Sequence, residues 1–195
     1  MKRLIFTATL CFGMLATAIA QKANVGVNLA GALPMGDLSN ASNFGYAGDV
    51  SFDYYFSDNF DLGLEVGYRR FGYSYESFGL DGEGINLVPV LITPAFHTDI
   101  DDWMDFYGEL GVGMYFGESR SAPENGDFAS FGASPRVGIA FELTPTVFFD
   151  LNVNYNYVMT DAYTETYRGT EYTLVPENLQ YLGLNVGLLY TIQEW

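Results

Sequence analysis

The chain has 195 residues, of which 24 are acidic and eight are basic, and its formal charge at pH 7 is −16. Affinity for nucleic acid depends on Lys and Arg side chains that neutralise phosphates, so this charge excludes nucleic acid as a partner. Aromatic residues make up 17% of the chain, yet Lys22 is the only lysine beyond residue 20. Soluble proteins usually cover their surfaces with Lys and Glu, which makes this composition unusual for one.

The first twenty residues have the pattern of a secretory signal peptide. Two basic residues precede an apolar run over 4–15, and an A-x-A cleavage site ends at Ala20. We therefore predict a signal peptide over 1–20 and a single barrel domain over 21–195. The mature chain then carries six basic residues against 24 acidic ones, a charge of −18. Cys11 leaves with the signal peptide, so neither a disulfide nor a thiolate site is predicted.

Eight segments of the mature chain alternate apolar and polar residues with the period of two that is typical of β-strands. They lie near 24–30, 46–56, 60–73, 85–96, 105–116, 136–142, 148–157 and 181–190. Short connections at 57–59, 97–104 and 143–146 alternate with longer predicted loops that are rich in glycine and acidic residues. These loops lie around 31–43, 74–84, 117–132 and 160–178. This layout predicts an all-β fold, an eight-stranded antiparallel up-and-down transmembrane β-barrel with short periplasmic turns and longer extracellular loops.

The two phases of these segments predict two faces of the barrel. One phase is aliphatic and aromatic, and we expect it to face lipid, where a closed barrel also satisfies every backbone hydrogen bond. The other phase mixes glycine with isolated charges, as expected for a narrow lumen in which each buried charge needs a partner. It predicts a lumen charge network of Asp49, Glu65, Arg69, Glu109, Arg136 and Asp150. The interior of an eight-stranded barrel is just wide enough for its own side chains to fill it. The lumen charge network could therefore serve structural packing or gate a narrow ion path.

Aromatic residues gather toward the ends of the lipid-facing segments, as they do in the girdles at membrane interfaces. The predicted interfacial aromatics are Tyr68, Trp103, Tyr155, Tyr157, Tyr190 and Trp195. The alternative is that aromatic side chains simply favour strands. Trp195 is out of phase with the preceding strand, which predicts either a bulge or a short tail.

The segment over 85–96 departs from the common pattern. It is apolar on both phases and contains Pro89 and Pro94. Each proline removes one backbone donor from a ladder, so we expect local irregularity in this strand.

Signatures of chemistry are scarce. His97 is the only histidine, and it lies in a predicted periplasmic turn, a membrane thickness away from Ser121 and Ser130 in the loops. A solvated histidine there cannot act as their base. The acidic residues that follow it lack the central Gly and the closing Glu of an EF-hand. We predict no enzyme activity, no catalytic or cofactor-binding residue, no cofactor and no metal site. The loop acids could still hold divalent cations that bridge to lipopolysaccharide phosphates.

With these features the chain resembles the small outer-membrane β-barrel superfamily that includes OmpA-type transmembrane domains and OmpX-type proteins, often labelled the porin family. The resemblance rests on architecture and on the strand patterns ELGVGMYF, RVGIAFEL and YLGLNVGLLY. It includes no diagnostic motif. Members commonly end in an in-phase aromatic residue, whereas Thr191 and Gln193 hold the in-phase positions here.

These observations lead us to expect a monomeric outer-membrane protein of a Gram-negative bacterium, surrounded by outer-membrane lipid and lipopolysaccharide. Its role would be structural or adhesive, or the binding of an unidentified extracellular ligand through the loops, or a narrow pore for small solutes. Two alternatives stay open. A secreted lipocalin-like carrier would turn the apolar phase inward around an apolar ligand, and a lipid-modifying barrel enzyme would need a catalytic base.

Overall fold

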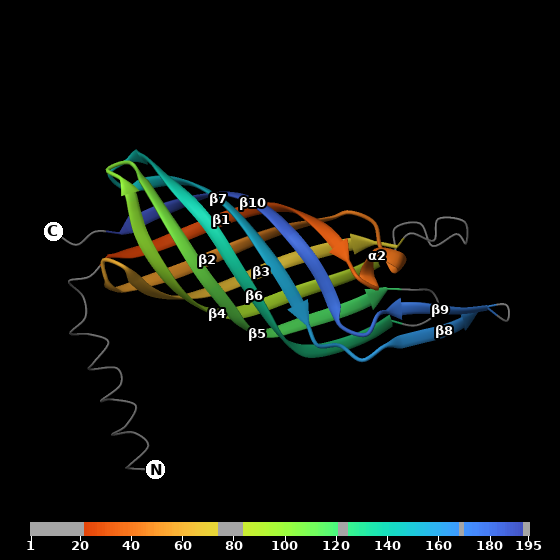
Figure 1. Cartoon of the computed structure of the whole chain (residues 1–195). Coiled ribbons are helices and arrows are strands. Elements are labelled where there is room, and N and C mark those ends of the chain that lie inside the picture. The colour runs from red at the N-terminus through yellow and green to blue at the C-terminus, as the bar shows by residue number, and fades with distance from the viewer. Residues whose placement is uncertain (1–21, 74–83, 121–124, 168–169, 193–195) are drawn as a thin grey trace, which may run out of the picture.

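A computed structural model describes residues 22–73, 84–120, 125–167 and 170–192, which form a closed barrel of eight antiparallel strands (Figure 1). The barrel strands are β1 (Ala23–Met35), β2 (Gly45–Ser57), β3 (Phe60–Gly72), β4 (Gly84–Asp101), β5 (Met104–Arg120), β6 (Asn125–Thr144), β7 (Val147–Val158) and β10 (Leu179–Ile192). Each barrel strand pairs with the next one along the chain, and β1 closes the barrel against β10. The predicted strand number, antiparallel pairing and closure are confirmed. The predicted signal peptide over 1–20 and Trp195 lie outside the described residues.

The alternation of the sequence becomes the inside and outside of this barrel. In β10, Leu184 is 51% exposed on the outer face, whereas the next residue, Asn185, is 4% exposed and points inward. The same alternation in all eight strands builds a continuous outer surface that we call the apolar belt. Its members include Val27, Leu29, Val50, Phe52, Leu62, Leu64, Val66, Val90, Ile92, Leu110, Val137, Leu151, Val153, Leu184, Val186 and Leu188. A lipocalin-like carrier would have the opposite arrangement, with these side chains inside.

The two ends of the barrel differ in their connections. Two-residue turns at Asp58-Asn59, Asp102-Trp103 and Pro145-Thr146 join strands at one end, which we call the short-turn end. The opposite, long-loop end carries the short helix α2 (Leu38–Ala41) and a hairpin of β8 (Tyr163–Tyr167) and β9 (Thr170–Val175). This hairpin projects beyond the barrel rim (Figure 1). No helix in the described ranges is long and apolar enough to cross a membrane.

The strands extend further toward the long-loop end than the sequence predicts. The prediction of a loop over 117–132 was largely wrong, because β5 and β6 stay paired as far as Arg120 and Asn125. Glycine, alanine and serine weaken the alternation there, although the backbone ladder continues. The last predicted loop contains the β8–β9 hairpin, in which Thr, Tyr and Val favour strand conformation. Most of the predicted loop over 74–84 lies outside the described residues.

The prolines of β4 interrupt its ladders without shifting the register. On the β3 side, pairing stops after Val66↔Val90 and resumes at Arg69↔Leu87, on either side of Pro89. The ladder to β5 has a gap of the same kind at Pro94. The predicted irregularity is thus confirmed as a pair of gaps. The strand itself remains continuous.

Candidate functional site: a lumen in three layers

Apolar side chains fill the lumen at the long-loop end. The rings of Phe71 and Tyr181 meet edge to face, with centroids 5.1 Å apart. We call this cluster the apolar layer, and each member is at most 5% exposed: Ala32, Leu38, Phe71, Tyr73, Ile85, Leu87, Leu91, Tyr115, Val158, Val175, Leu179 and Tyr181. The layer explains why β4 is apolar on both phases, since Ile85, Leu87 and Leu91 point inward. Packing of this kind closes the lumen toward the loops.

Two buried arginines and three carboxylates lie below the apolar layer. Arg69 forms an ion pair with Asp49 and lies 3.4 Å from Glu65 (Nη2 to Oε1). Arg136 Nη2 lies 2.5 Å from Glu65 Oε2, and its Nη1 lies 3.0 Å from Glu109 Oε1. Glu65 is 0% exposed and joins the two arginines. The structure therefore brings five of the six predicted network residues together, and we call these five the ionic layer.

Asp150, the sixth predicted residue, faces the same lumen but has different partners. Its carboxylate accepts hydrogen bonds from the Tyr107 hydroxyl at 2.8 Å and from the Asn152 side-chain amide at 2.6 Å. Further along β7, Asn154 accepts a hydrogen bond from Asn185 at 3.1 Å. The polar phase of β7 thus forms hydrogen bonds with side chains of the neighbouring strands β5, β6 and β10. The sequence analysis did not predict Tyr107 as a lumen residue, although it is two positions from Glu109 and so has the same strand phase.

His97 lies inside the barrel near the short-turn end, so the prediction of a solvated turn histidine was wrong. Because β4 continues to Asp101, position 97 falls on the inward phase, and the residue is 8% exposed. Its Nε2 lies 2.5 Å from Asp61 Oδ2 and its Nδ1 lies 2.6 Å from Asp105 Oδ2. The rings of Tyr55 and Tyr107 flank the imidazole, with centroids 5.3 and 5.5 Å away. We call these five residues the histidine layer.

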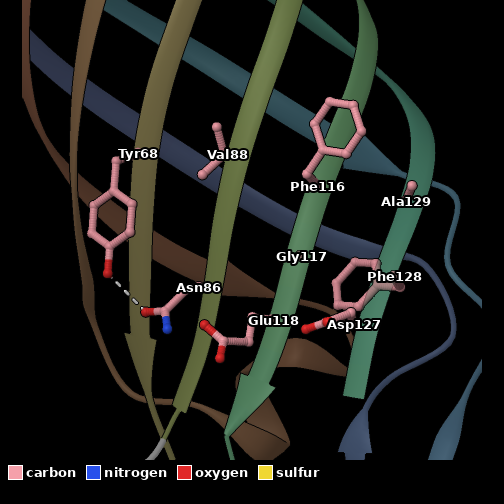
Figure 2. A pocket seen from close by; sticks show the side chains of 9 residues that line it. All are labelled: Tyr68, Asn86, Val88, Phe116, Gly117, Glu118, Asp127, Phe128 and Ala129. Atoms are coloured by element: carbon pink, nitrogen blue, oxygen red, sulfur yellow. Dashed lines mark hydrogen bonds between the residues drawn. The ribbon is translucent and has the colours of Figure 1, made fainter. Parts of the chain in front are cut away.

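A groove of about 610 Å³ crosses the outer face of β3 to β6 near the long-loop end. Figure 2 shows its lining, in which the Tyr68 hydroxyl donates a hydrogen bond to Asn86 Oδ1 at 2.9 Å. Glu118 and Asp127 lie in the groove as direct cross-strand partners. Like charges at directly opposed positions of a sheet repel each other.

The five predicted interfacial aromatics among the described residues lie at both ends of the apolar belt. Tyr68, Tyr155 and Tyr157 stand toward the long-loop end, where Tyr155 donates a hydrogen bond to Gln180 at 2.8 Å. Trp103 and Tyr190 are exposed toward the short-turn end. In the part of the chain that the structure describes, no group of three His, Cys, Asp or Glu residues is arranged to hold a metal ion.

Solved structures share this architecture at low sequence identity. Neisserial surface protein A has a TM-score of 0.62 and 14% identity, over 88% of this chain and 96% of that one. OprG from Pseudomonas aeruginosa has a TM-score of 0.59 and 13% identity, over 90% and 98%. This chain has the fold of the small outer-membrane barrels.

A further structural match is Ail, the attachment invasion locus protein of Yersinia pestis, in its complex with the heparin analogue sucrose octasulfate. Its TM-score is 0.57 and its identity 14%, over 88% of this chain and 99% of that one. No protein-family model and no curated protein matches the sequence. At these identities the likeness concerns the fold.

Proposed function

We propose that the chain is a monomeric, non-enzymatic, integral protein of a Gram-negative outer membrane, and that its closed barrel anchors and displays the long-loop end. The observation that carries this proposal is the combination of an apolar belt outside with a filled lumen inside. Short turns face the periplasm in barrels of this kind, so the β8–β9 hairpin and α2 face the exterior. The lumen charges then have a structural role.

Ion conduction is the test of this proposal. Planar-bilayer recordings on the purified protein should show no steady conductance, because the apolar layer blocks the lumen. A Phe71→Ala, Leu91→Ala, Tyr181→Ala variant removes much of that layer and serves as the open control. Steady conductance through the unchanged protein would favour the narrow-pore function instead.

The charge of the long-loop end favours a cationic or neutral partner over a polyanion. The stretches 31–43, 74–84, 117–132 and 160–178 hold 11 acidic residues and two arginines. Ail was crystallised with a sulfated sugar, whereas like charge would repel such a ligand here.

Proteoliposomes bearing this protein should adhere to a lysine-coated surface and not to a heparin-coated one. An Asp161→Asn, Glu177→Gln variant should adhere less, and equal adhesion to heparin would contradict the proposed charge preference.

The groove on the outer face supports a second role, the binding of lipopolysaccharide phosphate through a divalent cation. Glu118 and Asp127 supply oxygen ligands of the type that Mg²⁺ and Ca²⁺ prefer, and the groove continues along Val88 and Phe116. A Glu118→Gln, Asp127→Asn variant should lose Mg²⁺-dependent retention of lipopolysaccharide, while Asp161→Asn should keep it. Binding that is unchanged by chelation of divalent cations would exclude this role.

A further inference from the structure

A cavity of about 200 Å³ opens at the short-turn end of the barrel, beside the histidine layer. It lies at the opposite end from the displayed loops, so its role goes beyond the function proposed above. Aromatic side chains form part of its wall, and six carboxylates line it: Asp58, Asp99, Asp101, Asp102, Asp105 and Glu142. We call this cavity the acidic mouth.

An ammonium group of the chain itself lines the acidic mouth. Lys22 directly precedes β1, and its backbone carbonyl accepts a hydrogen bond from the Tyr55 N–H at 3.1 Å. Its Nζ lies 4.6 Å from the centroid of the Tyr55 ring and 5.5 Å from that of Phe148. A cation within about 6 Å of a ring centroid is attracted by the face of the ring. The mouth therefore already accommodates a primary amine against aromatic walls.

Acceptors inside the mouth exceed what this lysine can satisfy. Asp105 Oδ1 is buried and has no hydrogen-bond donor among the described residues. A smaller cavity of about 30 Å³ continues inward and shares Tyr55 and His97 with the mouth. Asn28 lines this smaller cavity at 4% exposure, and its Oδ1 likewise has no donor among the described residues. A space of this size accommodates one water-sized group.

From these features we propose that the acidic mouth binds a small organic diamine or polyamine through its primary ammonium groups, and that Lys22 is a built-in competitor. Several carboxylates around one cavity match a ligand that carries more than one positive charge. The faces of Tyr55 and Phe148 favour an alkylammonium over a hydrated inorganic ion, since they also cover its methylene groups. The volume of the mouth admits a short alkyl chain and excludes a folded protein.

Trp103 provides a direct readout of this site. Its indole N–H donates a hydrogen bond to Asp101 Oδ2 at 3.1 Å within the mouth, and Trp195 is the only other tryptophan. In a Trp195→Phe background, the protein purified from membranes is titrated with 1,5-diaminopentane at constant ionic strength. Trp103 fluorescence should change saturably, and 1,5-pentanediol should produce no such change. Lys22→Ala should tighten diamine binding by about two- to fivefold, the range that exposed cation–π contacts span.

Matched variants separate a site from general attraction to an acidic protein. Asp99→Asn with Asp102→Asn, at the mouth, should weaken binding, whereas Asp37→Asn with Asp161→Asn, at the other end, should leave it unchanged. Tyr55→Phe should retain binding and Tyr55→Leu should lose it. If Tyr55→Leu fails to fold, Phe148→Leu tests the second ring.

Four results would overturn the proposal. The first is that both pairs of acid variants weaken diamine binding equally, and the second is that Trp103 fluorescence responds equally to the diol. The third is that Lys22→Ala binds the diamine with unchanged or weaker affinity. The fourth is that the protein binds a trilysine peptide and does not bind the diamine.

Discussion

Glu65 is the residue that connects the ionic layer. It is fully buried and contacts both Arg69 and Arg136. Without this carboxylate, Arg69 keeps only Asp49 and Arg136 keeps only Glu109 as ion-pair partners, in a site from which water is excluded. The contribution of Glu65 to the stability of the barrel is therefore measured by replacing it with an uncharged side chain of the same size.

Glu65→Gln should lower the free energy of unfolding by about 3–5 kcal/mol, the usual cost of breaking a buried ion pair. Urea unfolding of the folded protein in lipid vesicles measures this change. Glu142→Gln, at the exposed end of β6, is the matched control and should stay within about 0.5 kcal/mol. A Glu65→Gln protein as stable as the control would show that the ionic layer does not stabilise the barrel.

Glycines in the strands have different roles at different registers of the barrel. A Cβ on Gly67 of β3 would overlap Asp49 Oδ1 and Arg69 Nη1, so the ionic layer needs the space that this glycine leaves. A Cβ on Gly108 of β5 would have no neighbour within 4 Å. Glycine is thus required for packing at position 67 in β3, whereas at position 108 in β5 a larger side chain would fit.

Gly67→Ala should destabilise the barrel by about 1–3 kcal/mol, because overpacking displaces the Asp49–Arg69 pair. Gly108→Ala should be neutral or stabilising by up to about 1 kcal/mol, because alanine restricts the unfolded chain more than glycine does. Both values come from the same unfolding experiment. Equal effects of the two substitutions would contradict the packing argument.

The β8–β9 hairpin is an element outside the barrel. Its strands pair only with each other, and the barrel closes without them. The Thr160 hydroxyl donates a hydrogen bond to the Pro176 carbonyl at 2.9 Å and so joins the two segments that lead into and out of the hairpin. This connection lies next to Val175 of the apolar layer.

Replacement of residues 164–173 by a short Gly-Ser linker should leave the barrel folded, because Thr160, Val175 and Pro176 remain. The folded band of a heat-modifiability gel, in which boiling shifts the mobility of an intact barrel, measures this. A variant that runs at the boiled position without boiling would show that the hairpin is part of the folding unit. The same variant should adhere less to a lysine-coated surface, since Glu165, Arg168 and Glu171 leave with the hairpin and the chain loses one net negative charge.

The whole molecule has an exterior whose composition suits hydrocarbon and an interior that is polar in its middle. This distribution predicts a cost for charge that depends on depth in the membrane. Val186 stands midway along β10 in the apolar belt, whereas Ile192 ends the same strand at the short-turn end.

Val186→Arg should cost about 2–4 kcal/mol of unfolding free energy in lipid, and Ile192→Arg about 0–1 kcal/mol, as found near membrane interfaces. Val186→Leu controls for the loss of the original side chain. If arginine were tolerated equally at both positions, the apolar belt would not lie in hydrocarbon.

The sequence by itself determined the two faces of each strand, their number and their antiparallel order. Side-chain direction in a strand alternates as a local property, so Leu184 and Asn185 can be assigned to opposite faces without knowledge of any neighbour. Even the apolar layer has a local signal, the loss of alternation over 85–96. Strand ends were harder to predict, because β6 begins in residues too small to display the pattern.

Only the tertiary structure decided which inward-facing residues meet. Glu65 and Arg136 are 71 positions apart in sequence, and the register in which the barrel closes brings them into contact. The same register pairs Asp150 with Tyr107 instead of an arginine, and it places His97 between Asp61 and Asp105. A period of two specifies a face, whereas a partner depends on the stagger between strands, which is a property of the closed sheet and of no single segment.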